Sequence, residues 1–214
     1  MAITISQKAI DLIVDFEVTS KSYYERNYRK PEWPGGASGI TIGIGYDLGY
    51  CSRDKIIGDW QGKVDESMLE DMLKYSGISG TRAKARLSEA RSEIDIPWET
   101  AMEVFMERDV PEWTEKVIKA LPNTDQLSED SLGALVSLAY NRGPSFNLSG
   151  SRYAEMRDIK EHMANEEFDE IPDDIRDMKR LWPNVKGLLR RRDAEADLFE
   201  EGLSGDEPDT EENR

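Results

Sequence analysis

The sequence contains little of the residue types that build disulfide frameworks, metal centres and nucleophilic triads. It has one cysteine, Cys51, and one histidine, His162, in 214 residues. A single cysteine excludes an internal disulfide framework and a cysteine-based zinc site. A single histidine argues strongly against a Ser-His-Asp triad and against a multi-histidine metal centre. We therefore expect neither a metal nor an organic cofactor.

Long apolar runs and positive charge are also scarce. No stretch approaches 18 uninterrupted apolar residues, so we expect no membrane-spanning helix and no membrane insertion. The first residues lack a basic region followed by a long apolar run, so no classical signal peptide is predicted and the localisation stays open. The formal net charge of -16 disfavours binding to the phosphate backbone of nucleic acids.

The length of the chain predicts one domain that can bury a stable core without disulfide bonds or a structural metal ion. We assign residues 1–203 to this domain and expect it to be a monomer. Residues 204–214 are rich in acids and poor in apolar side chains, which predicts a disordered acidic tail.

The hydrophobic pattern changes its period along the N-terminal part of the chain. Ser6 is placed to cap a helix that runs through about residue 19. Two prolines and three glycines in residues 20–39 indicate extended chain and loop. Isoleucines alternate with threonine and glycine from residue 40, which predicts a glycine-rich strand at about 39–47. Helical patterns dominate the rest, so we predict an α+β fold that is mostly helical, with a small N-terminal β region.

Glu17 falls on the apolar side of the first predicted helix, since it follows Val14 by three positions and Ile13 by four. One interpretation is a glutamate that is simply solvated or salt-bridged at a helix end. The other is a carboxyl group in a partly apolar cleft, where it stays protonated and acts as a general acid. The spacing alone leaves both open.

Thr41 and Asp47 lie on the predicted glycine strand and directly at its end. The glycines would let a ligand approach the backbone closely. The segment is not a phosphate-binding loop, because it lacks the Lys-Ser/Thr pair of a P-loop and any βαβ context. Asp47 has a simpler interpretation as a turn residue.

Three segments together resemble a known family. The helix that ends in Glu17, followed by an aromatic-rich stretch and TIGIGYD, is similar to the phage-type lysozymes, most closely to their pesticin-like muramidase branch. LVSLAYNRG resembles the family's helix at the floor of the cleft. GLLRRRDAEADLF resembles its last helix, whose arginine reaches the catalytic glutamate. The resemblance spans residues 17 to 199 and implies a lysozyme-like fold.

The resemblance implies a muramidase that hydrolyses the β-1,4 bond between N-acetylmuramic acid and N-acetylglucosamine in bacterial peptidoglycan. Glu17 would protonate the leaving oxygen, Asp47 would act as base or stabilise the oxocarbenium ion, and Thr41 would position water. This arrangement implies inversion. Ordinary phage lysozymes carry the second carboxylate before the strand, where Glu25 and Glu32 both fit poorly. We therefore assign it to Asp47, with Glu25 as second choice.

The substrate-binding residues are assigned from the same resemblance. Asn141 would bind substrate or water, Arg191 would pair with Glu17, and Tyr24 and Tyr46 are candidates to stack on sugar rings, as is Trp33. Two other functions remain open. A lytic transglycosylase would use Glu17 alone and release anhydro sugars, and an inactive glycan-binding or interaction module would keep the fold without catalysis.

Overall fold

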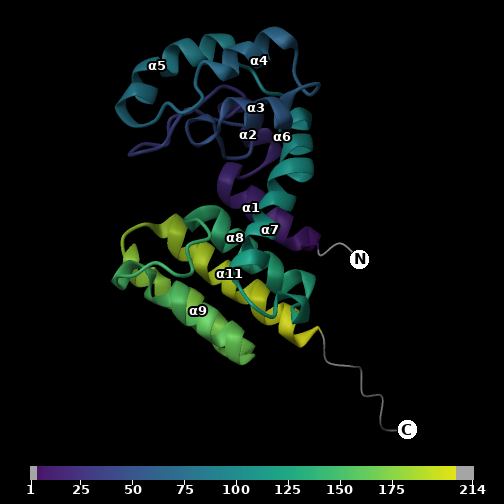
Figure 1. The fold of residues 1–214 in the computed structure, drawn as a ribbon, viewed down its shortest axis with the longest axis vertical. Coiled ribbons are helices and arrows are strands. Elements are labelled where there is room, and N and C mark those ends of the chain that lie inside the picture. The colour runs from purple at the N-terminus through teal and green to yellow at the C-terminus, as the bar shows by residue number, and fades with distance from the viewer. Residues whose placement is uncertain (1–3, 206–214) are drawn as a thin grey trace, which may run out of the picture. The chain divides into compact units, whose positions relative to one another are not determined.

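The computed structural model describes residues 4–205 of the chain. These residues are mostly helical, as the sequence predicts (Figure 1). The predicted small β region is present in the N-terminal half, as a two-stranded antiparallel sheet. Within the single domain predicted for 1–203, the structure separates two compact units. Unit 1 is Met1–Phe16 with Pro111–Arg214, and unit 2 is Glu17–Val110. The tail predicted for 204–214 lies outside the described residues from 206 onward.

Helix α1 (Gln7–Val18) begins where the sequence predicts. The hydroxyl oxygen of Ser6 accepts a hydrogen bond from the Ala9 N–H at 3.1 Å, which confirms the predicted cap. The helix ends in a tight turn at Thr19, whose φ is +67°. The Ser20 N–H donates to the Val18 carbonyl at 2.8 Å across this turn. Glu17 therefore occupies the last turn of α1.

The prediction of extended chain over 20–39 is wrong for its first part. Helix α2 (Lys21–Asn27) forms there, and the Ser20 hydroxyl caps it by accepting from the Tyr23 N–H at 3.2 Å. The two prolines lie beyond the helix and so do not interrupt it. Tyr24 anchors the helix, because its buried ring packs edge-on against Trp98 at 5.4 Å between centroids.

The single strand predicted at 39–47 is in fact a hairpin. Strands β1 (Thr41–Ile42) and β2 (Tyr46–Asp47) pair antiparallel, with Thr41 opposite Asp47. Gly43 and Gly45 have φ values of +57° and +77°, which L side chains rarely adopt, so the chain turns where continuous strand was predicted. The alternating isoleucines are buried nonetheless.

The rest of unit 2 is helical. Its elements are η1 (Leu48–Tyr50), α3 (Arg53–Trp60), α4 (Glu66–Leu73), α5 (Gly80–Glu93), α6 (Trp98–Val104) and the π-helical segment η2 (Phe105–Asp109). Trp60 and Tyr75 are among its largest fully buried side chains, together with several isoleucines. This core lies beneath the hairpin, since a Cβ atom added to Gly43 would lie 3.5 Å from the edge of the Trp60 ring.

Unit 1 consists of the first part of α1 and a C-terminal set of helices. These are α7 (Val110–Ala120), η3 (Thr124–Gln126), α8 (Glu129–Arg142), η4 (Ser151–Tyr153), α9 (Ala154–Asn165), η5 (Phe168–Glu170), α10 (Ile171–Asp177), η6 (Met178–Leu181) and α11 (Lys186–Ser204). Helix α11 packs against α8 (Figure 1) and against α10. Helix α8 is buried over most of its length, and a Cβ on Gly133 would overlap Ala9 of α1. Between residues 4 and 205, no helix is both long and apolar enough to cross a bilayer.

Candidate active site

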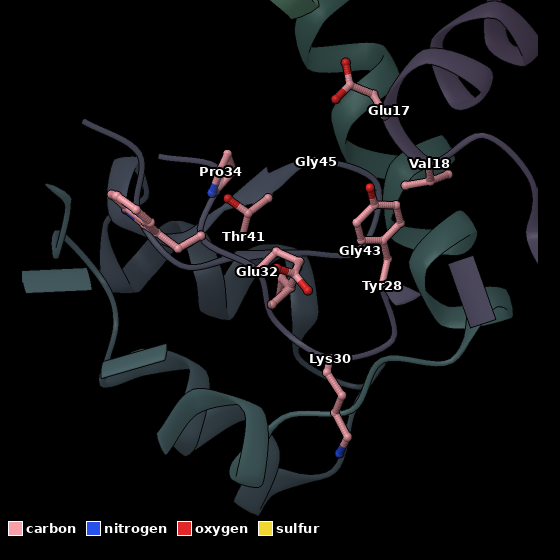
Figure 2. A pocket seen from close by; sticks show the side chains of 11 residues that line it. Glu17, Val18, Tyr28, Lys30, Glu32, Pro34, Thr41, Gly43 and Gly45 are labelled. Carbon is pink, nitrogen blue, oxygen red and sulfur yellow. The ribbon is translucent and has the colours of Figure 1, made fainter. Parts of the chain in front are cut away.

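Unit 2 contains a pocket of about 310 Å³ beside the hairpin (Figure 2). This volume lies at the lower end of the range for small-ligand sites. The pocket is lined by side chains from the end of α1, the segment before β1, and β1 itself. They include Glu17, Tyr28, Lys30, Glu32, Trp33 and Thr41, and the hairpin glycines complete the wall.

Glu17 reaches this pocket from the last turn of α1, as the interpretation of Glu17 as a cleft residue requires. Its side chain is half-buried, and the neighbouring Val18 is buried and also lines the pocket. Tyr28 lies close to this end of the helix (Figure 2). Burial raises the pKa of the Tyr28 phenol, and the negative charges of Glu32 and Glu17 raise it further. Both carboxylates therefore act on one aromatic residue of the pocket.

Thr41 also lines the pocket, where it begins β1. Its backbone forms an antiparallel bridge with Glu32: the Glu32 N–H donates to the Thr41 carbonyl at 2.9 Å, and the Thr41 N–H donates back at 2.8 Å. The Thr41 Oγ1 atom is buried and has no hydrogen-bond partner in the part of the chain that the structure describes. A buried hydroxyl without a partner is uncommon, and it marks a place where a ligand group or water could bind.

Glu32 lines the pocket, although its position in the sequence fits the pattern of ordinary phage lysozymes poorly. The bridge to Thr41 brings it to the site, and its carboxylate forms an ion pair with Arg91 of α5. Arg91 also donates through Nε to the Pro31 carbonyl at 2.9 Å, so it holds both the backbone before Glu32 and the carboxylate. The spacing of nine residues between Glu32 and Thr41 does not predict that they are neighbours, because only the backbone bridge brings Glu32 next to Thr41.

Asp47 lies elsewhere. Its carboxylate is not part of the pocket lining and accepts hydrogen bonds from the backbone of its own loop. Oδ1 accepts from the Gly49 N–H at 2.8 Å, and Oδ2 accepts from the Gly39 N–H at 2.9 Å. Burial raises the pKa of Asp47, and the backbone N–H donors oppose this shift. These contacts fit the simpler interpretation of Asp47 as a turn residue, while its catalytic role stays a prediction.

Two aromatic residues do not meet the prediction that they stack on sugars. Tyr24 is 0% exposed and its hydroxyl donates to the Ile96 carbonyl, whereas Tyr46 is 4% exposed and its hydroxyl donates to Asp59. Neither ring offers a face to a ligand, because both are packed into the core. The aromatic residues that do line the pocket are Trp33, which is a predicted candidate for stacking on sugars, and Tyr28, which the sequence did not predict.

Asn141 and Arg191 belong to a polar cluster of unit 1. Asn141 is an exposed residue at the end of α8, and its Oδ1 accepts from Arg192 Nη2 at 3.1 Å. Arg191 is 2% exposed and donates through Nε to Glu195 Oε1 at 3.0 Å. Their roles in binding substrate, and the pairing of Arg191 with Glu17, stay predictions.

The remaining candidates add little to the site. Glu25, the second choice for the base, is an exposed residue of α2 and does not line the pocket. Cys51 is a buried free cysteine. From residue 4 to residue 205, no three or more His, Cys, Asp or Glu side chains gather as metal ligands would.

Comparison with known proteins gives a family but no activity. No curated protein matches the chain. Residues 13–130 match the family described as a domain of unknown function, DUF8812. The match covers more than half of the chain and includes Glu17, Glu32, Thr41 and Asp47. The chain therefore belongs to the DUF8812 family.

Proposed function

We propose that the protein is a glycoside hydrolase with a lysozyme-like fold that cleaves peptidoglycan. It hydrolyses the β-1,4 bond between N-acetylmuramic acid and N-acetylglucosamine, with Glu17 as the general acid. The observation that carries this proposal is one pocket that holds both the carboxyl at the end of α1 and the threonine at the start of the glycine hairpin. They are two of the three catalytic positions that the resemblance to phage-type lysozymes singles out; the third, Asp47, does not line the pocket.

The chemistry of the pocket supports the proposal. Glycoside hydrolysis needs a carboxylic acid that protonates the leaving oxygen and a second carboxylate, and a neighbouring hydroxyl can help to position water. Glu17 is half-buried next to Val18, and Thr41 offers a hydroxyl that both donates and accepts. Tyr28 and Trp33 add aromatic surface to the lining. Rings of this kind provide large contact areas for sugars at little cost in conformational entropy.

The test compares the purified wild type with Glu17→Gln on isolated peptidoglycan and identifies the products by mass spectrometry. Gln keeps the shape of the side chain but cannot donate a carboxyl proton, so release of reducing-end muropeptides should fall about 10²–10⁴-fold. Anhydro products would instead establish a transglycosylase. Wild-type protein that pellets with peptidoglycan but releases no products would indicate a glycan-binding module.

A further inference from the structure

The pocket contains two acidic side chains among the residues that the structure describes, Glu17 and Glu32. If the site hydrolyses glycosides, a second carboxylate has to direct and deprotonate water. The resemblance assigned this task to Asp47, which does not line the pocket. Glu32 is therefore the candidate that position favours.

The bridge between Glu32 and Thr41 fixes the relation of their side chains. The two residues exchange both backbone hydrogen bonds, at 2.9 and 2.8 Å, and so stand directly opposite each other. Directly opposed residues project their side chains from the same face of a ladder, with Cβ atoms about 5 Å apart. Glu32 and Thr41 consequently lie next to each other in the pocket lining (Figure 2). Asp47 is opposite Thr41 on the other side of β1, but its carboxylate is bound by the N–H groups of Gly39 and Gly49 and does not line the pocket.

Thr41 supplies the second observation. Its Oγ1 is buried without a hydrogen-bond partner in the described chain, although a hydroxyl can donate one hydrogen bond and accept two. A substrate water that donates to Glu32 and exchanges a hydrogen bond with Thr41 would satisfy this hydroxyl. A core threonine without function would more often bond to a nearby carbonyl.

Arg91 gives the Glu32 carboxylate a fixed orientation. Its Nη2 donates to Glu32 Oε1, while its Nε donates to the Pro31 carbonyl at 2.9 Å. Oε1 of Glu32 is thus held from α5, and Oε2 is the oxygen that would accept from a substrate water. Catalytic groups need this kind of support, because small errors of placement reduce the rate strongly.

Asp47 serves the loop instead. Its two oxygens accept from the Gly39 and Gly49 N–H groups, and a Cβ on Gly39 would overlap Asp47 Oδ1. The glycine at 39 thus makes room for the carboxylate under the backbone. A group with these partners holds the turn after β2 and is poorly placed to exchange a proton with a substrate water.

We propose that Glu32 is the second catalytic carboxylate, a role that rests on the proposed glycosidase function. Water held between Glu32 and Thr41 attacks the anomeric carbon. A new C–O bond forms there while the bond to the leaving oxygen breaks. Glu32 takes a proton from the water, and Glu17 gives its proton to the leaving oxygen, so the reaction is a hydrolysis without any change of oxidation state. Attack from the face opposite the leaving group gives an inverted product.

The experiment measures kcat for peptidoglycan cleavage in wild type, Glu32→Gln, Asp47→Asn and Glu70→Gln. Glu70 is an exposed residue of α4 away from the pocket lining, so its variant controls for loss of one charge. We expect Glu32→Gln to lose about 10²–10⁴-fold in kcat while its unfolding midpoint and its pelleting with peptidoglycan stay near those of wild type. Asp47→Asn should mainly lower the midpoint, and Glu70→Gln should match wild type.

Two results would overturn the assignment, and they are distinguishable. If wild type cleaves peptidoglycan and folded Glu32→Gln keeps more than about a third of its kcat, the assignment falls while the proposed function stands. If wild type releases no products, the proposed function and the assignment fall together. Should Glu32→Gln unfold, Arg91→Gln provides the second variant. It keeps the Glu32 carboxylate but loosens it, so kcat should fall with little change in KM, and an unchanged kcat would count against the proposal.

Discussion

Thr19 ends helix α1 in a backbone conformation that β-branched residues avoid. Its φ of +67° lies in the left-handed region, and its side chain is exposed. The hydrogen bond from Ser20 N–H to the Val18 carbonyl closes a γ-turn-like arrangement, a strained form. The strain lies two residues after Glu17, where it stops the helix. Substitution of Thr19 by glycine should relieve it.

The expected gain follows from two opposing effects. A residue with a Cβ costs about 1–2 kcal/mol in the left-handed region. Glycine removes that cost, but it has more conformational freedom in the unfolded chain, and this lowers the free energy of unfolding by about 0.5–1 kcal/mol. Because the threonine side chain is exposed, little packing is lost with it. The free energy of unfolding of Thr19→Gly should therefore rise by about 1 kcal/mol.

Urea denaturation checks this value through a higher midpoint at unchanged slope. Thr19→Ala is the matched variant, since it keeps the Cβ but removes the branch, and its gain should be smaller. We also expect the rate of peptidoglycan cleavage to fall in Thr19→Gly, because a freer turn holds Glu17 less firmly, in the usual exchange of stability for activity. A loss of 1 kcal/mol or more in Thr19→Gly would refute the argument from strain.

Two further predictions concern unit 1. Glu195 is fully buried between two arginines, so Glu195→Gln should cost about 3–5 kcal/mol of unfolding free energy, whereas Glu200→Gln at the surface should cost at most about 1 kcal/mol. Equal losses would contradict this reasoning. Burial raises the pKa of Asp174 to about 6, and the hydrogen bond to Asp174 raises the pKa of His162 despite the lowering effect of burial. Both groups thus bind protons more tightly when folded. The free energy of unfolding should therefore fall by about 3 kcal/mol as pH rises from about 4 to above 6.5, and Asp174→Asn should flatten that fall in urea titrations.

Local signals in the sequence were sufficient for the elements that depend on neighbouring residues. The Ser6 cap and the placement of Glu17 on the apolar side of α1 follow from spacing along one helix. The alternation of isoleucines also indicates that Thr41 lies on a strand, and the structure places Thr41 in β1, where it lines the pocket. The bend at Gly43 was missed, because a glycine permits a positive φ but does not require one.

The parts that the sequence could not predict depend on contacts between distant segments. Glu32 joins the pocket through a bridge to Thr41 and an ion pair with Arg91, and neither contact leaves a periodic trace in the sequence. The same holds for the aromatic residues: Tyr24 is buried by Trp98, whereas Tyr28 faces the pocket. Composition identified the aromatic cluster but could not separate its structural members from its exposed ones.

The division of the chain into two units has a consequence for the order of folding during synthesis. Unit 2 is one continuous stretch, Glu17–Val110, whereas unit 1 is assembled from segments on both sides of it. All residues of the pocket have therefore left the ribosome before any of α8 or α11 is made. Helix α1 has to wait for α8 before Ala9 can meet Gly133. Domains fold as units during translation. A nascent chain whose α8 has not yet emerged from the ribosome should therefore protect the pocket region from proteases while residues 7–16 of α1 are still open to them.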